Sequence, residues 1–279
     1  ALASHLLAER PFRCAWDNDV ALKALSFGGP LILSGMALFV NMHGERILVA
    51  SQFTTRDLGI FSAAFTLATT PGLLLTTIQQ RYFLPHLVRA ADTAGELAFR
   101  VNEALRITLS SGAGFVVAAF VLGAPVFSLV FGERFAEGAD YVALLALITA
   151  LSTMRSGPTV VALRLGHTLD IMAGNVVRLL ALPIAILAVF EGGSIKDILI
   201  IGWLGETVAL VTAYLLMRWR GTRPSASTLL VLAMALALSM VLGSSLAFEE
   251  FGQGALVAAV LLLGLMVVVS FSTLLLKRN

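Results

Sequence analysis

Long apolar stretches separated by short polar segments occupy most of the chain. A membrane-spanning helix needs about 20 predominantly apolar residues, and eight stretches meet this requirement. No stretch alternates apolar and polar residues for long enough to suggest a barrel strand. The pattern predicts an all-α polytopic membrane protein of about eight transmembrane helices, at 27–53, 58–84, 107–131, 141–163, 169–190, 195–217, 228–247 and 255–276.

Local signals refine this set of helices. Gly157 and Pro158 interrupt the hydrogen-bond ladder of helix 141–163, and Pro71 predicts a kink in helix 58–84. Residues 79–81 (Gln-Gln-Arg) are expected to anchor the end of helix 58–84 at the lipid headgroups. Residues 85–106 predict a helical linker at the inner face, the longest segment outside the membrane.

Composition agrees with a lipid environment. Of the 279 residues, 58% are hydrophobic and 13% are charged, whereas soluble domains average about 25% charged residues. A soluble enzyme, a disordered chain and a nucleic-acid-binding protein are therefore excluded. The single Cys14 excludes an intrachain disulfide, and the four histidines are too far apart for a local metal motif, so we expect no metal and no cofactor.

The basic residues predict an orientation. If the N-terminal segment is cytoplasmic and the helices alternate, most of the 19 basic residues lie on the inner side. The outer side then receives only Arg46, Arg56, Arg134 and Lys196. We therefore expect both ends of this chain to be cytoplasmic. Because the chain begins at Ala1 rather than at a methionine, we also expect it to be part of a longer protein.

Two ionisable residues lie deep in predicted spans. Arg178 and Glu206 are each about 14–17 Å from a membrane face, at the same level on adjacent antiparallel helices. Charge at this depth is costly unless it is paired or faces a polar cavity. Two interpretations remain open here, namely a structural ion pair and a substrate or ion cavity.

Two further helices contain residues that are candidates for lining that cavity. Asn41, Glu45 and Gln52 share one face near the outer end of helix 27–53, which suggests either a cavity rim or an interfacial anchor. Arg155 directly precedes the Gly157–Pro158 interruption, a place where helices often line cavities.

Several segments resemble the C-terminal portion of the polysaccharide biosynthesis proteins, the Wzx-type oligosaccharide flippases of the multidrug/oligosaccharidyl-lipid/polysaccharide exporter superfamily. The similar segments are FGGPLILSG at 27–35, GERIL at 44–48, LGIFSAAF at 58–65, YFLPHLVRA at 82–90, PVFSLVFGERF at 125–135 and LRLGHT at 163–168. The resemblance covers about residues 27–220, with the last two helices compatible in number only.

The resemblance implies a domain organisation. Residues 27–220 would form one six-helix transporter lobe, preceded by a cytoplasmic segment at 1–26 and followed by two additional transmembrane helices at 221–279. A first lobe, preceding this one in the same transporter, would be missing from this chain and would be its partner.

The resemblance also implies a function. Family members move polyprenyl-diphosphate-linked oligosaccharide across the bacterial inner membrane for surface polysaccharide or O-antigen synthesis, with polysaccharide polymerase machinery as a further partner. By this resemblance, Glu45 and Arg46 correspond to the family's acidic–arginine pair, although Glu45 stands where many relatives have aspartate. Arg155, Arg178 and Glu206 are assigned to substrate binding on physical grounds alone.

Other functions were weighed against this one. A drug or cation antiporter and a peptidoglycan-precursor flippase belong to the same superfamily. A membrane glycan polymerase or acyltransferase is the alternative from another class, but short outer loops leave little room for its chemistry. Phosphate-binding, nucleophile-elbow and zinc-protease motifs are absent from the sequence, so we expect no enzymatic activity.

Overall fold

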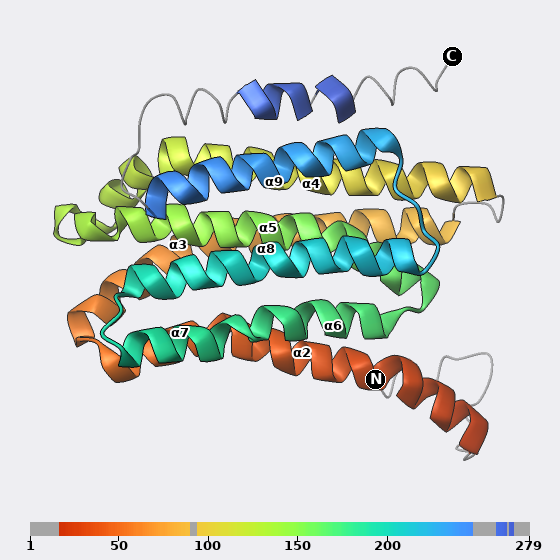
Figure 1. Ribbon diagram of the computed structural model, residues 1–279, viewed down its shortest axis with the longest axis horizontal. Helices are drawn as coiled ribbons and strands as arrows, with labels where there is room; N and C mark the ends of the chain where they lie inside the picture. Colours follow the sequence, from red (N-terminus) through yellow and green to blue (C-terminus); the bar gives the residue numbers. More distant parts are fainter. Residues whose placement is uncertain (1–16, 90–93, 248–260, 267, 271–279) are drawn as a thin grey trace, which may run out of the picture.

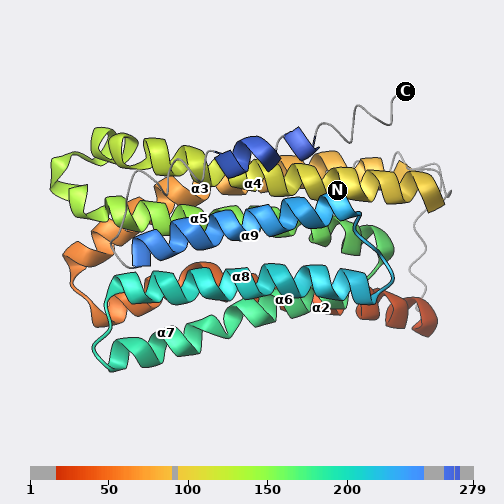
Figure 2. The same ribbon diagram turned by 45° about the horizontal axis from the view of Figure 1, so that its top comes forward.

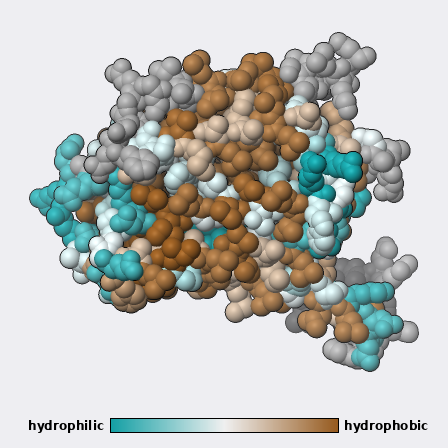
Figure 3. Space-filling view, in the orientation of Figure 1, coloured by the Kyte–Doolittle hydropathy of each residue, from teal (hydrophilic) through white to brown (hydrophobic). Residues whose placement is uncertain are grey.

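The computed structural model describes residues 17–89, 94–247, 261–266 and 268–270. Seven of the helices in these ranges are long and apolar enough to cross a membrane, where α6 and α7 together count as one span. The helices run side by side, and the apolar surface forms a broad band between more polar ends (Figures 1 and 3). The chain is thus an all-α multi-pass membrane protein, as the apolar pattern predicts.

The order of the elements follows the predicted order, with several boundaries displaced. The elements are α2 (Asn18–Gln52), α3 (Thr55–Arg89), α4 (Ala94–Phe131), the 3-10 helix η1 (Glu133–Gly138), α5 (Ala139–Leu165), α6 (Thr168–Leu179), α7 (Ala181–Phe190), α8 (Ile195–Trp219) and α9 (Ala226–Ala247). The predicted eighth span at 255–276 lies mostly outside the described residues, although 261–266 and 268–270 are helical.

Side chains next to the helix ends explain several boundaries. The Asp17 carboxylate accepts hydrogen bonds from the backbone N–H groups of Asp19 and Val20, so α2 begins well before the predicted residue 27. Ser194 and Asp197 form a reciprocal capping box at the start of α8. Gly166 ends α5 in the left-handed region at φ 75°, which glycine adopts without strain.

The predicted inner-face linker is helical wherever it is described. Helix α3 continues to Arg89 and α4 begins at Ala94, so the two helices extend beyond the predicted spans. The predicted helical structure of residues 85–106 is therefore confirmed, apart from 90–93, which lie outside the described residues, while the position of this segment at the inner face stays a prediction.

The predicted span at 169–190 is confirmed as one segment long and apolar enough to cross a membrane, Thr168–Phe190, but it is divided at Leu180, because α6 ends at Leu179 and α7 begins at Ala181. Pro183 explains the interruption. It has no backbone N–H to donate to the carbonyl of Leu179, four residues earlier. In contrast, α5 continues as one helix through Pro158, and α3 continues as one helix through Pro71.

Helix α5 lies at the centre of the bundle and α2 at its edge. Of the residues in the apolar 18-residue stretch of each helix, 83% are buried in α5 and 11% are buried in α2. Figures 1 and 2 show α2 alongside α6, with its N-terminal part extending past the other helices.

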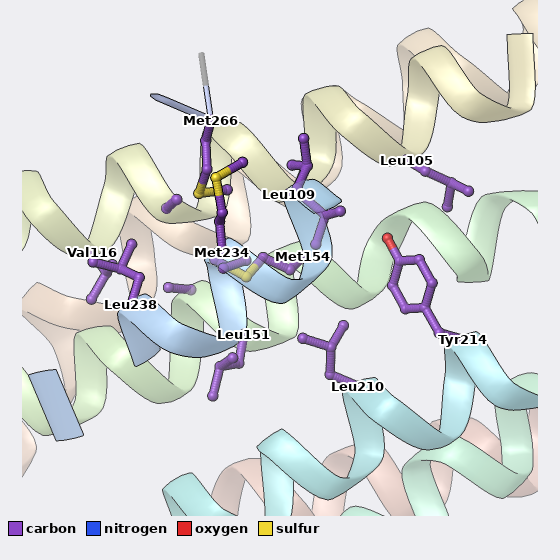
Figure 4. Packing of buried hydrophobic residues seen from close by; sticks show 14 of the residues in the cluster. Leu105, Leu109, Val116, Leu151, Met154, Leu210, Tyr214, Met234, Leu238 and Met266 are labelled. Carbon is purple, nitrogen blue, oxygen red and sulfur yellow. The ribbon is translucent and has the colours of Figure 1, made fainter. Parts of the chain in front are cut away.

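Two hydrophobic clusters hold the bundle together. The larger one joins residues of α4, α5, α8 and α9, and it includes Leu109, Met154, Leu210 and Leu238 (Figure 4). The other cluster lies toward the end of the bundle where α3 begins and includes Phe61, Phe127 and Ile198.

Candidate functional site

Four charged side chains from four helices form one buried cluster, hereafter the ion cluster: Glu45 of α2, Arg155 of α5, Arg178 of α6 and Glu206 of α8. Arg155 Nε donates to Glu206 Oε1 at 2.8 Å, and Arg178 Nε lies 3.2 Å from Glu206 Oε2. Arg178 Nη2 also donates to Glu45 Oε1. The four residues are between 3% and 7% exposed.

Asn175 extends the ion cluster toward α2. Its Oδ1 accepts a hydrogen bond from Arg155 Nη1 at 2.7 Å, and its Nδ2 donates to Ser34 Oγ at 2.7 Å. Its backbone oxygen accepts from Asn41 Nδ2 at 3.2 Å. This asparagine was not among the predicted site residues. Its spacing of three residues before Arg178, on the same helix face, was the available signal.

The predicted site residues are therefore brought together, with one exception. Arg178 and Glu206 are bonded as their equal depths suggested, and Glu45 and Arg155 join them. Arg46 does not join the ion cluster, because its guanidinium carbon lies 4.7 Å above the centre of the Phe65 ring. A role for any of these side chains in substrate binding remains a prediction.

The division between α6 and α7 and two glycines of α8 explain how the charged side chains come into contact. Arg178 lies in the last turn of α6, where the partial negative charge of a helix C-terminus favours a cation. A side chain at Gly202 of α8 would place its Cβ 2.8 Å from Glu45 Oε1 and 3.2 Å from Arg178 Nη2. At Gly205, a Cβ would lie 2.5 Å from Ala181 Cβ. Glycine at these positions lets α8 approach α6, α7 and the ion cluster closely.

The ion cluster carries two positive and two negative formal charges, so it is neutral overall. Charges removed from water are costly unless each has partners with good hydrogen-bond geometry. Glu206 is bonded by both arginines, whereas Glu45 is bonded only by Arg178 among the described residues. The two carboxylates therefore differ in how firmly they are held.

The ion cluster lies in the wall of a partly open cavity of about 100 Å³, hereafter the central cavity. All four charged residues line it, together with Asn41. The rest of its wall is mainly apolar and comes from α2, α3 and α5, with Leu38, Met42, Phe65, Leu73, Leu145 and Ile148 among the lining residues.

Arg155 also lines a second, small cavity of about 20 Å³, hereafter the end cavity, where α5 ends and α6 begins. Its lining includes His167, Asp170 and Arg220, and Arg220 Nη2 lies 3.1 Å from Asp170 Oδ1. Arg155 thus separates two spaces within the bundle. Among the described residues, no group of three or more His, Cys, Asp or Glu side chains is placed to hold a metal ion.

Gln79 differs from its predicted role as a headgroup anchor. It is 4% exposed, its Oε1 accepts from Ser156 Oγ at 2.6 Å, and its Nε2 donates to Ser111 Oγ at 2.5 Å. The headgroup prediction is wrong for Gln79 because its side chain is buried among protein hydrogen-bond partners, whereas for Gln80 and the exposed Arg81 it stays a prediction. The Gln79 side chain instead joins α3, α4 and α5 by hydrogen bonds within the bundle.

Comparison with known proteins gives one match. No curated protein and no solved structure matches the chain significantly. A family model described as polysaccharide biosynthesis protein matches residues 2–140, which include α2, α3, α4 and the Glu45 arm of the ion cluster. The all-α membrane fold agrees with this match and with the resemblance of the apolar segments. The first half of the chain thus matches the polysaccharide biosynthesis protein family.

Proposed function

We propose that the protein translocates polyprenyl-diphosphate-linked oligosaccharide from the inner to the outer leaflet of the bacterial inner membrane by alternating access. The observation that carries the proposal is the pair of buried arginines, Arg155 and Arg178, in the wall of the central cavity. A guanidinium binds phosphate oxygens in two places at once, which suits a diphosphate headgroup. The family match over residues 2–140 supports a role in polysaccharide synthesis.

The shape of the central cavity supports a lipid-linked substrate. Its wall is polar on the side of the ion cluster and apolar on the sides of α2 and α3. Both helices also carry large exposed apolar residues, among them Met36 and Phe39 of α2 and Leu74 and Ile78 of α3. A diphosphate head would bind at the arginines while its lipid tail stays in the bilayer.

A partner lobe completes the proposal. In alternating access, two lobes rock about a central site near the bilayer midplane. The exposed apolar face of α2 and α3 would meet the first lobe of the same transporter, and polysaccharide polymerase machinery would receive the translocated product. We place both ends of this chain in the cytoplasm and propose no enzymatic activity.

Translocation of a fluorescent lipid-linked oligosaccharide tests the proposal. Liposomes containing the full-length protein should move the lipid between leaflets, measured as loss of fluorescence to a membrane-impermeant quencher. Arg178→Gln should reduce the rate at least tenfold, whereas Arg56→Gln should leave it unchanged, because Arg56 lies on an exposed outer turn. Equal rates with and without the protein would contradict the proposal.

An organic-cation antiporter is a second candidate, favoured by one observation. Two carboxylates, Glu45 and Glu206, line the same largely apolar cavity, and apolar walls with buried carboxylates suit a lipophilic cation. The alternatives predict opposite results in one assay. An antiporter would move a lipophilic cation against a proton gradient and leave the lipid-linked oligosaccharide in place.

A further inference from the structure

Helix α2 is attached to the rest of the bundle by few apolar contacts. Of its 35 residues, only Ser34, Ala37, Glu45, Leu48 and Val49 are buried. Its polar contacts to α6 are more extensive, because Ser34, Asn41 and Glu45 each bond to Asn175 or Arg178. The position of α2 over the central cavity thus depends strongly on polar contacts, which can exchange with a ligand.

The two carboxylates of the ion cluster are unequal candidates for such exchange. Glu206 is bonded by Arg155 and Arg178, so its removal would leave both arginines without their shared partner. Glu45 bonds Arg178 alone and lies on the peripheral helix. Both line the central cavity, so a ligand in the cavity can reach either carboxylate. The contact that a ligand would displace first is therefore the one between Glu45 and Arg178.

We propose that Glu45 is an exchangeable internal counter-ion of Arg178, and that a phosphate group entering the central cavity takes its place and releases α2 from α6. The inference rests on the proposed function and deepens it, because it assigns Arg178 as the diphosphate-binding arginine and Glu45 as its competitor. Glu206 and Arg155 remain paired during the exchange.

Charge balance gives the exchange its direction. With Glu45 in place the ion cluster is neutral, so an anionic ligand that simply added to it would leave excess negative charge within the membrane. Displacement of the Glu45 carboxylate from Arg178 keeps the arginine compensated once the phosphate arrives. The displaced carboxylate takes up a proton from solvent as it turns toward the central cavity with the movement of α2, so that no uncompensated carboxylate remains in the membrane. Binding of the headgroup is thereby coupled to the position of a cavity-lining helix.

The proposal predicts that Glu45 lowers the apparent affinity for diphosphates. A protein whose binding-competent state is only partly populated binds with an affinity reduced by that fraction. If the Glu45 contact is present in nine molecules out of ten, its removal should tighten binding about tenfold. The opposite is expected at Glu206, because losing this carboxylate disorders both arginines.

Binding of farnesyl diphosphate to the full-length protein in nanodiscs tests these expectations, with farnesol as the uncharged control. We expect Glu45→Gln to tighten diphosphate binding about tenfold, Glu45→Asp to tighten it less, Arg178→Gln to abolish it, and Glu206→Gln not to tighten it. Glu137→Gln is the matched control, because Glu137 forms an exposed ion pair on the outer turn. Size-exclusion profiles check that each variant is folded. If Glu45→Gln does not fold, the binding affinity of Glu45→Asp tests the same expectation.

A distance measurement gives a second readout. Spin labels at Val40 of α2 and Leu204 of α8, both exposed, report the separation of the two helices in a protein whose Cys14 is replaced by serine. Farnesyl diphosphate should lengthen or broaden the wild-type distance distribution, and Glu45→Gln should do so without ligand. Unchanged distributions in both cases would overturn the proposal.

The outcomes separate this proposal from the proposed function. Tighter binding by Glu45→Gln without translocation of lipid-linked oligosaccharide would support the exchange and contradict the transport. Unchanged or weaker binding by a folded Glu45→Gln protein would overturn the exchange even if transport is observed. Absence of farnesyl diphosphate binding by the wild type and by Glu45→Gln would overturn the exchange.

Discussion

Arg155 and Glu206 form the shortest charge-assisted contact between α5 and α8, with Nε of the arginine 2.8 Å from Oε1 of the glutamate. The two residues are 51 positions apart in the chain, and both side chains are almost completely buried. Through this contact the central helix of the bundle is joined to the carboxylate that also binds Arg178.

Glu206→Gln should destabilise the protein. The substitution leaves Arg155 and Arg178 with a neutral amide, and breaking a buried ion pair costs about 3–5 kcal/mol. We expect a lower melting temperature in detergent and loss of transport. Glu137→Gln should change neither, since the side chains of Arg56 and Glu137 are 67% and 69% exposed. Transport at the wild-type rate by a normally inserted Glu206→Gln protein would show that Glu206 has no role in the central cavity.

Arg155→Lys should reduce transport by about tenfold or more while preserving the charge. Arg155 bonds Glu206 through Nε and Asn175 through Nη1, and a lysine ammonium is a compact point charge without this planar geometry. Transport kinetics of the lysine variant, compared with those of Arg56→Lys in the exposed first turn of α3, would measure the effect. Equal rates for Arg155→Lys and the wild type would show that the charge alone suffices.

Gly202→Ala should separate Glu45 from Arg178. The added Cβ would lie 2.8 Å from Glu45 Oε1, a distance that requires the carboxylate or α8 to move. We expect a loss of stability of about 1–3 kcal/mol, measured by thermal unfolding, together with reduced transport. Gly114→Ala in α4 is the matched control, because a Cβ there meets nothing within 4 Å. If both variants behave alike, close packing at Gly202 is not required.

The depth of charged residues was sufficient to predict the contact between Arg178 and Glu206, because antiparallel neighbours of similar length bring equal depths together. The participation of Arg155 was not predictable in this way, since it depends on how α5 is rotated within the bundle. Burial of Gln79 likewise depends on tertiary packing, because the same sequence would suit a headgroup anchor if α3 ended earlier. The break at Leu180 did have a local signal, Pro183, whose missing N–H disrupts the ladder four residues upstream.

The long helices were predictable from their apolar lengths, whereas their ends were not. Helix α2 begins at Asn18 because Asp17 caps it, and capping acts on the backbone independently of the apolar pattern. Apolar length indicates where a helix lies in lipid, and a helix can continue beyond its apolar stretch, as α3 does to Arg89.

The distribution of basic residues predicts which ends of the helices are cytoplasmic. The loop with Gly221 and Arg223, between α8 and α9, should lie inside, and the turn with Arg134, between α4 and α5, should lie outside. Single cysteines at these positions, in a protein whose Cys14 is replaced by serine, can be labelled in intact cells with a membrane-impermeant maleimide. We expect labelling at position 134 and none at position 223. The reverse pattern would invert the orientation.

Removal of the Ser239 hydroxyl should lower the stability of the protein, whereas removal of the Tyr214 hydroxyl should maintain or raise it. Ser239 Oγ accepts a hydrogen bond from Trp203 Nε1 at 2.9 Å, so Ser239→Ala leaves a buried indole N–H without its partner, at a cost of about 1–2 kcal/mol. The hydroxyl of Tyr214 is buried without a hydrogen-bond partner among the described residues, in the cluster shown in Figure 4. Removing this hydroxyl relieves a desolvation penalty and leaves the ring in place, so Tyr214→Phe should maintain or raise stability. Measured in the same detergent, the melting temperature of Ser239→Ala should lie below the wild-type value. That of Tyr214→Phe should equal or exceed it. A lower melting temperature for Tyr214→Phe would show that the hydroxyl has a partner in the membrane-embedded protein.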